Sequence, residues 1–219
     1  MQTIPVTVLD NFFDDPDGVR KWALEQEYFK DPAGAWPGKR TLPLDRLNLP
    51  LLEHLSRKYF SLFFNFDKED VHWKIDACFQ MIDKHAGSGW VHHDSPQRIS
   101  GIIYLSPGAD LNSGTSIFRR KDGARITNFE RVNKIRMASY RGEVTSAEAD
   151  TIRLEDREVY EETIKVSNVY NRLLTFDSYL HHSAQEFFGE DIDSRLTLVF
   201  FITKLMSDRT PVGRLRSTD

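Results

Sequence analysis

The sequence has little cysteine and no long hydrophobic run. Cys78 is its single cysteine, so it forms neither an internal disulfide nor a cysteine-based zinc site, and we expect a reducing, cytoplasmic location. The longest strongly apolar run, from Leu198 to Ile202, is far too short to span a bilayer. The first residues lack a basic region followed by an apolar stretch, which predicts no signal peptide. These absences exclude a disulfide framework and a membrane span.

The chain also lacks a strong excess of charge of one sign. It contains 29 Lys and Arg against 33 Asp and Glu, a formal net charge of −4, so no global field attracts nucleic acid or an anionic membrane. Hydrophobic residues make up 40% and charged residues 28%, which is typical of a globular protein. No repeat or linker divides the 219 residues. We therefore expect one domain, as a monomer or a homodimer.

Helix signals are present in the N-terminal part of the chain. Asp15-Pro16 is an N-cap followed by a proline at the first helical position, and apolar residues follow at helical spacing: Val19, Trp22 and Ala23. Asn48-Leu-Pro50 opens a second apolar-periodic segment, which ends in the aromatic-rich Tyr59–Phe64. We expect residues 1–70 to be a helical support region whose aromatic side chains pack on a sheet.

From Val71 the pattern changes to short β-type runs separated by turn residues. The predicted strands are Cys78–Asp83, Trp90–His92, Arg98–Leu105, Ser116–Arg119, Arg172–Phe176 and Arg195–Thr203. Many short strands without helices between parallel neighbours indicate a β-sandwich or a jelly-roll barrel. The predicted fold class is therefore mainly β (α+β), with core segments 71–118 and 169–205.

Residues 119–168 interrupt this pattern. The run 119–141 carries eight Lys or Arg, and the run 143–162 carries eight Asp or Glu. Asn128–Arg141 and Ala147–Val166 are predicted to be helical or irregular, as an insertion between two core strands that is a candidate lid over the site. Opposed charge runs of this kind most often pair with each other in solvent.

The first chemical signal is the motif Trp90-Val-His-His-Asp94. Residues two apart on a strand share a face, so His92 and Asp94 project together while His93 points away. The motif Tyr179-Leu-His-His-Ser183 supplies a further imidazole, from His181 or His182. Two imidazoles and one carboxylate on one side of a metal leave three positions open, the arrangement of non-haem Fe(II) oxygen chemistry. The carboxylate and the absence of a thiolate favour iron over zinc.

A third signal is the strand that begins at Arg195. Alternation places Arg195 and Thr197 on one face of this strand. A guanidinium facing the barrel interior is an unpaired buried charge unless it meets an anion, and a carboxylate bound bidentately is the natural partner. Tyr104 is positioned to add its hydroxyl to the same carboxylate. The alternatives are core packing for Tyr104, and for Arg195 an exposed ion pair with one of the nearby acids Glu190, Asp191 and Asp193.

At these residues the sequence resembles the Fe(II)- and 2-oxoglutarate-dependent dioxygenases, in their prolyl-4-hydroxylase-like branch. The family pattern is His-x-Asp, a distal His, and an Arg near the start of the last core strand. Shorter matches occur at Ile103–Ser106, Ser113–Phe118 and Phe176-Asp-Ser. The resemblance covers Phe79–Thr203 and implies a double-stranded β-helix, a cupin-like jelly roll.

The resemblance implies a role for each site residue. His92, Asp94 and His182 would hold Fe(II), because the segment His182-Ser-Ala-Gln matches the family better than a segment starting at His181. Arg195, Tyr104 and Thr197 would bind the distal carboxylate of 2-oxoglutarate, and O2 would take the last metal position. The implied reaction hydroxylates a C–H bond and converts 2-oxoglutarate to succinate and CO2.

The substrate stays open at this point. A peptide or protein side chain and a small metabolite are both compatible, since a fold does not assign a substrate. The basic run in the insertion motivates nucleic-acid demethylation as an alternative, which the acidic net charge opposes. A non-catalytic cupin-like module that binds a metal or a carboxylate is the other alternative. The loop Trp36–Arg40 is expected near the barrel mouth, and three histidines are expected to be structural: His54, His72 and His85.

Overall fold

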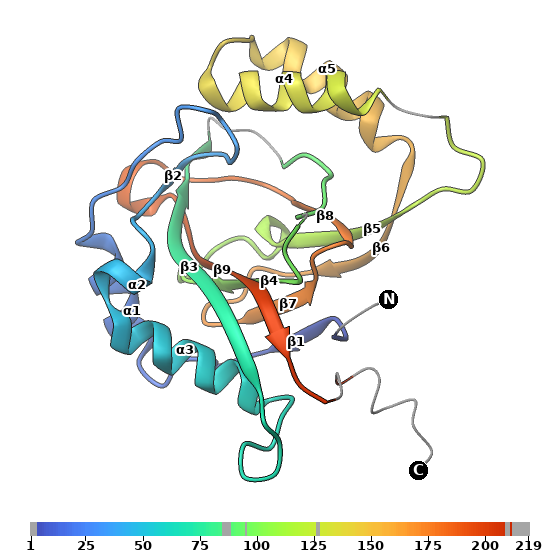
Figure 1. Ribbon diagram of the computed structural model, residues 1–219. Coiled ribbons are helices and arrows are strands. Elements are labelled where there is room, and N and C mark those ends of the chain that lie inside the picture. The colour runs from blue at the N-terminus through green and yellow to red at the C-terminus, as the bar shows by residue number, and fades with distance from the viewer. Residues whose placement is uncertain (1–3, 85–88, 95, 126–127, 209–210, 212–219) are drawn as a thin grey trace.

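The computed structural model describes residues 4–84, 89–94, 96–125, 128–208 and 211. Its strands form two antiparallel sheets, drawn in Figure 1. The larger has the order β1-β7-β4-β9-β3-β2 and the smaller the order β6-β5-β8. The described strands are β1 (Thr7–Leu9), β2 (Lys39–Arg40), β3 (His72–Ile82), β4 (Ile99–Tyr104), β5 (Thr115–Arg120), β6 (Tyr160–Val166), β7 (Leu173–Asp177), β8 (His181–Ala184) and β9 (Arg195–Met206).

Three N-terminal helices share one hydrophobic core with the larger sheet, and the sequence predicted the first and the third of them. They are α1 (Pro16–Leu24), α2 (Leu44–Leu47) and α3 (Leu49–Ser61). The Asp15 carboxylate accepts a hydrogen bond from the Gly18 amide at 2.9 Å and caps α1, while Asn48 caps α3 through the Leu51 amide at 3.1 Å. Both caps satisfy free amides at a helix start, which is why these polar residues stand before the apolar runs.

The helix-facing core is built on aromatic contacts between α3 and the sheet. Tyr59 packs edge-on against Phe200 of β9, with ring centroids 5.1 Å apart, and its hydroxyl lies 3.2 Å from the Thr175 hydroxyl on β7. A side chain on Gly101 of β4 would place its Cβ 2.0 Å from the Phe200 ring. A glycine is therefore required where this ring crosses β4.

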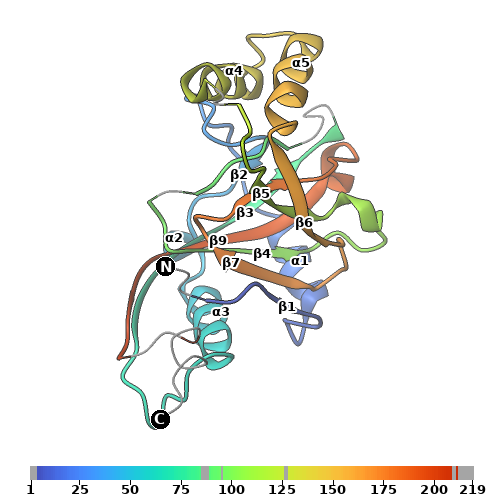
Figure 2. The ribbon, with the colours of Figure 1, turned by 90° about the vertical axis from the view of Figure 1, so that its right-hand side faces the viewer.

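Two further helices lie together at one end of the molecule, away from α3 (Figure 1). They are α4 (Phe129–Arg141) and α5 (Ser146–Arg157), and Figure 2 shows them beyond the ends of the core strands. Arg141 donates to the Ala33 carbonyl at 2.9 Å, which attaches α4 to the loop before β2. No helix of the described part of the chain is long and apolar enough to cross a membrane.

Several secondary-structure predictions need correction. Tyr160–Val166 is not helical but forms β6, which pairs with β5; its exposed, charged positions hide the strand pattern. The expected strand at Trp90–His92 is reduced to one isolated bridge, between His92 and His182. The short strands β1, β2 and β8 were not predicted, because stretches this short carry no periodicity of their own.

The charge runs of the insertion pair as predicted. Arg119 of β5 forms an ion pair with Glu161 of the neighbouring β6, and Arg141 pairs with Glu143 just beyond α4. Both pairs join a member of the basic run to a member of the acidic run. The opposed runs are therefore paired in part, through Arg119 and Arg141.

Candidate functional site

Three polar side chains from two distant segments meet in the interior. His182 lies on β8, and His92 is paired with it: each backbone amide donates to the other residue's carbonyl, at 3.0 and 2.8 Å. Asp94 follows two residues later, and its amide donates to the Ser178 carbonyl at 2.8 Å. One ligand-type atom from each of His92, Asp94 and His182 lies within 4.8 Å of the other two. The structure thus brings together the three residues predicted from the sequence.

The two imidazoles are oriented by backbone carbonyls. His92 Nδ1 lies 2.8 Å from the Trp90 carbonyl, and His182 Nδ1 lies 2.9 Å from the Leu180 carbonyl. Since a carbonyl oxygen only accepts, each Nδ1 donates to its carbonyl, which leaves each Nε2 as the ring atom that could bind a metal. The Nε2 atoms lie 3.5 and 3.3 Å from the Asp94 oxygens. Asp94 outweighs burial and raises the pKa of His182. The arrangement directs two Nε2 atoms and one carboxylate toward a common point, where a cation could take the place of a proton.

Asp94 is held in place by a serine. Ser100 on β4 donates its hydroxyl proton to Asp94 Oδ2 at 2.7 Å, and its oxygen lies 2.8 Å from the Ser178 hydroxyl. Burial opposes ionisation of Asp94, but His182 and His92 outweigh it and hold the pKa of Asp94 well below its usual range. The carboxylate is therefore anionic and oriented at neutral pH.

The neighbouring histidine of each motif takes no part in this cluster. The His93 and His181 rings pack against each other, with centroids 5.6 Å apart, and Tyr160 packs on His181 at 4.9 Å. His54 stacks on Phe13, whereas His72 lies 3.1 Å from Asp70. His85, the seventh histidine, lies outside the described residues.

Arg195, at the start of β9, is buried without an ion-pair partner among the described residues. Its side chain is 3% exposed, its Nε donates to the Ser113 carbonyl at 3.1 Å, and its Nη2 has no hydrogen-bond partner. Burial lowers the pKa of Arg195. The ion pair with Glu190, Asp191 or Asp193 that the sequence left open is not formed.

Tyr104 and Thr197 face each other across β4 and β9, next to Arg195. The Tyr104 hydroxyl donates to the Thr115 hydroxyl at 2.9 Å, and the Tyr104 ring centroid lies 5.5 Å from the Arg195 guanidinium carbon. The buried Thr197 hydroxyl has no partner. Arg195 and Thr115 line the cavity, whereas Tyr104 and Thr197 lie behind them.

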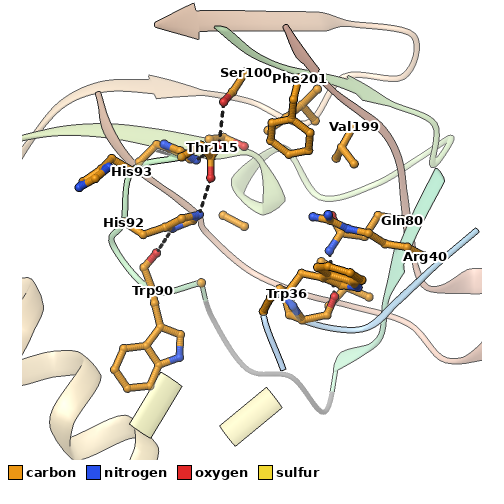
Figure 3. A pocket seen from close by; sticks show the side chains of 18 of the residues that line it. Trp36, Arg40, Gln80, Trp90, His92, His93, Ser100, Thr115, Val199 and Phe201 are labelled. Atoms are coloured by element: carbon orange, nitrogen blue, oxygen red, sulfur yellow. Dashed lines mark hydrogen bonds and ion pairs between the residues drawn. The ribbon is translucent and has the colours of Figure 1, made fainter. Parts of the chain in front are cut away.

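These groups share one cavity of about 490 Å³ between the two sheets. Figure 3 shows His92 and Ser100 on one side, and Trp36, Arg40 and Gln80 across from them, with Val199 and Phe201 along the wall. Such a volume is in the range of small-molecule sites. The cavity therefore has room for a ligand beside the three clustered residues.

Part of this wall was not predicted from the sequence. The loop Trp36–Arg40 was expected near the mouth, and the structure puts Trp36 and Arg40 on the cavity itself. Arg136 and Tyr140 of α4 also line it, although the sequence assigned Arg136 only to a solvated basic run. The signal available was their spacing of four residues, which puts both on one face of a helix.

Comparison with known proteins gives a family and a fold. The chain belongs to the family described as "Family of unknown function (DUF6445)", whose model matches residues 1–202. No curated protein matches the chain in sequence.

Solved structures that resemble the chain include oxygenases and prolyl hydroxylases. HygX from Streptomyces hygroscopicus, solved with nickel and 2-oxoglutarate bound, aligns with a TM-score of 0.53 at 14% identity, over 92% of this chain and 83% of HygX. A Pseudomonas putida prolyl-4-hydroxylase aligns with a TM-score of 0.46 at 14% identity, over 91% and 92%. A 2OG-Fe(II) oxygenase family oxidoreductase from Burkholderia pseudomallei gives 0.48 at 13%, over 90% and 84%. The likeness to HygX is one of fold.

Proposed function

We propose that this protein is an Fe(II)- and 2-oxoglutarate-dependent oxygenase that hydroxylates a C–H bond of its substrate. The observation that carries the proposal is one cavity that holds both a His-Asp-His cluster and a buried arginine without a counterion. The His-Asp-His cluster suits a metal, and the buried arginine suits a ligand with a carboxylate. The protein would accordingly be an oxidoreductase.

The cluster fits a first-row metal such as Fe(II). His92, Asp94 and His182 offer two imidazole nitrogens and one carboxylate, with no thiolate among them, which is the donor set of non-haem iron oxygenases. The hydrogen bonds from both Nδ1 atoms and from Ser100 supply the outer partners that such ligands usually have. These three residues would hold the metal.

The other end of the cavity fits the distal carboxylate of 2-oxoglutarate. Arg195 Nη2 is a buried donor without a partner, and the Thr197 hydroxyl beside it is a second unpaired group. Leaving such groups unpaired is costly, so an anion that accepts from Arg195 compensates for their burial. Arg195 would bind this carboxylate with Thr115, while Tyr104 positions Thr115 through its hydrogen bond.

When bound, iron with 2-oxoglutarate and O2 supplies oxidative decarboxylation to succinate and CO2, coupled to insertion of an oxygen atom into a C–H bond. The chain's own residues bind the carboxylate, orient the three ligands and restrict the access of water. The proposal treats the two sheets as a jelly roll in one domain, with 1–70 as support, 71–118 and 169–205 as core, and 119–168 as an insertion that covers the cavity.

Two alternatives are weaker. Nucleic-acid demethylation needs a free basic surface, and the basic run is partly neutralised by Glu161 and Glu143. A non-catalytic cupin-like module that binds a metal or a carboxylate would not need all three metal ligands and the buried Arg195 together in one cavity.

The test is anaerobic titration of Fe(II) and then 2-oxoglutarate into the apo protein. We expect a weak visible metal-to-ligand charge-transfer band that requires both additions, followed by succinate release when O2 is admitted. Metal binding without the band would overturn the proposal. A band without succinate release would support the non-catalytic module instead.

A further inference from the structure

A second cationic region lies on the cavity wall across from the His-Asp-His cluster. Arg40 comes from β2 and Arg136 from α4, and both line the same cavity. The Arg40 guanidinium carbon lies 4.5 Å from the centroid of the Trp36 ring and 5.8 Å from that of Phe201. Figure 3 shows Trp36 and Arg40 stacked opposite His92. This region is built from segments about a hundred residues apart.

Neither guanidinium has an ion pair with a described carboxylate. Arg40 Nη2 donates to Gln80 Oε1 at 3.4 Å and Arg136 Nη2 donates to Asn133 Oδ1 at 2.7 Å. The Nε of each is buried and has no hydrogen-bond partner among the residues that the structure describes. Two cations held only by neutral amides leave an uncompensated positive charge inside the cavity.

No ion pair joins the nearby described acidic groups, Asp31 and Asp76, to Arg40 or Arg136. The Asp31 carboxylate accepts from the amides of Ala33 and Ala35, at 3.2 and 2.6 Å. Asp76 is an exposed residue that lines the cavity. Burial lowers the pKa of Arg40 despite the opposing influence of Cys78, Asp94 and Asp31. The guanidinium is thus desolvated without a dedicated counterion.

Unpaired groups on the wall are mostly donors. Of the buried side-chain atoms without a partner, five belong to residues that line this cavity: Trp36 Nε1, Arg40 Nε, Gln97 Oε1, Arg136 Nε and Arg195 Nη2. Four of these five atoms are N–H donors. Buried polar atoms normally have partners, and a surplus of donors matches a ligand rich in acceptors. Arg195 is assigned to the cosubstrate, which leaves the donors of Trp36, Arg40 and Arg136.

We propose that Arg40 and Arg136, with Trp36 beside them, bind the anionic group of the substrate that is oxidised, and that this substrate is a small organic acid carrying a carboxylate or a phosphate. This inference rests on the proposed function, because it assigns the remaining part of the same cavity. Guanidinium forks match both anions bidentately. The Trp36 ring offers a face to an apolar or aromatic part of the molecule. A cavity of about 490 Å³ that also takes 2-oxoglutarate suits a metabolite rather than a folded partner.

The test follows the indole N–H signal of Trp36 by NMR in ¹⁵N-labelled protein, assigned with Trp36→Phe. Zn(II) and 2-oxoglutarate are present to occupy the cluster and Arg195. The probes are phenyl phosphate, phenylacetate and the neutral benzyl alcohol. We expect one or both anions to shift the Trp36 signal saturably, and benzyl alcohol to leave it unchanged. The anion that binds more tightly shows whether the substrate carries a phosphate or a carboxylate.

Variants then locate the binding groups. Arg40→Gln with Arg136→Gln should weaken binding of the anionic probe about tenfold or more, since hydrogen bonds to charged groups are lost. Arg131→Gln, an exposed arginine on the same helix, is the matched control and should bind as the wild type does. Arg40→Lys keeps the charge and should lose less affinity than Arg40→Gln, which separates loss of the cation from loss of the fold.

Three outcomes would overturn the inference. They are equal binding of benzyl alcohol, unchanged affinity in the double variant, and tighter binding of an uncharged proline-containing peptide amide than of either acid. The titration is repeated without Zn(II) and 2-oxoglutarate. An anion response there, with no charge-transfer band from Fe(II), leaves the anion site standing and removes the oxygenase. A charge-transfer band without a response to either anion supports the oxygenase and overturns the anion site.

Discussion

His92 and His182 are joined to each other through their backbones. The amide of each donates to the carbonyl of the other, at 3.0 and 2.8 Å, and their ring centroids lie 4.4 Å apart. A pair fixed in this way needs little rearrangement to share a metal, since both Nε2 atoms already lie beside Asp94. Two segments ninety residues apart thus hold the two histidines of the proposed metal site in a fixed relative position.

Each of the two proposed histidine ligands has an adjacent histidine in the sequence, which provides a control variant for metal binding. We expect His182→Ala to lower Fe(II) affinity about a hundredfold or more, because losing a direct ligand should exceed the effect of losing an outer partner. His181→Ala should change the Fe(II) affinity by much less than the roughly 10- to 100-fold loss typical of an outer-shell partner, since its ring packs on Tyr160 and not in the cluster. Competition with a chromogenic chelator under anaerobic conditions measures both. Equal losses in the two variants would contradict the assignment.

Ser100 should tune the metal site without touching the metal. Its hydroxyl donates to Asp94 Oδ2 at 2.7 Å, so Ser100→Ala removes a partner that orients the carboxylate. The expected loss of Fe(II) affinity is about 10- to 100-fold, with the thermal unfolding midpoint changed little. Ser100→Thr, which keeps the hydroxyl, should recover part of the affinity. An affinity unchanged in Ser100→Ala would show that this hydrogen bond does not matter.

Arg195 offers a test that separates ligand binding from stability. Arg195→Met should raise the KM for 2-oxoglutarate about tenfold or more, because a charged hydrogen bond to the carboxylate is lost. In the absence of ligand, the same change removes an unpaired buried charge, so the urea midpoint should not fall. A large drop in that midpoint would mean that Arg195 is a structural residue. Fe(II) affinity is the internal control and should be retained.

Gly101 tests the packing of the helix-facing core. Gly101→Ala would place a Cβ 2.0 Å from the Phe200 ring, which is itself confined by Tyr59. We expect the free energy of unfolding to fall by about 1–3 kcal/mol through overpacking. Adding Phe200→Leu should recover part of that loss, as a double-mutant cycle in urea would show. Strict additivity of the two changes would argue against the clash.

The ion pair between Asp10 and Arg172 gives a pH dependence of stability. Arg172 donates to both Asp10 oxygens, at 2.5 and 2.9 Å, and the hydrogen bond lowers the pKa of Asp10. A carboxylate with a lowered folded pKa stabilises above its unfolded pKa, near about 4, and the contribution is lost as pH falls through the folded pKa.

Asp10→Asn should therefore cost less than about 1 kcal/mol at pH 7, because the pair is half exposed and screened. The difference from wild type should shrink toward zero as the pH falls through the lowered pKa of Asp10. Denaturant melts at pH 7 and at acidic pH measure it, with Asp122→Asn at an exposed position as the control. If the stability difference between Asp10→Asn and wild type does not change with pH, the charge of the Asp10 carboxylate does not cause it.

Local patterns in the sequence were sufficient for a good part of the molecule. The caps at Asp15 and Asn48 predicted two helices, since a polar residue before an apolar period satisfies free amides wherever it occurs. The spacing of His92 and Asp94 predicted that they share a side. Tyr160–Val166 escaped prediction because its strand is half exposed and charged, and only its pairing with β5 makes it a strand.

The sequence by itself determined the chemical types at the site: the two histidine motifs, the aspartate and an arginine that opens the last long strand. For the choice between His181 and His182 the sequence offered only the family resemblance, and the tertiary structure packs His181 against His93, outside the cluster. It alone brought Arg40 and Arg136 onto the same cavity. Which residues line the cavity depends on how the loop before β2 and helix α4 pack across the sheets. The spacing of residues along the chain does not determine this packing.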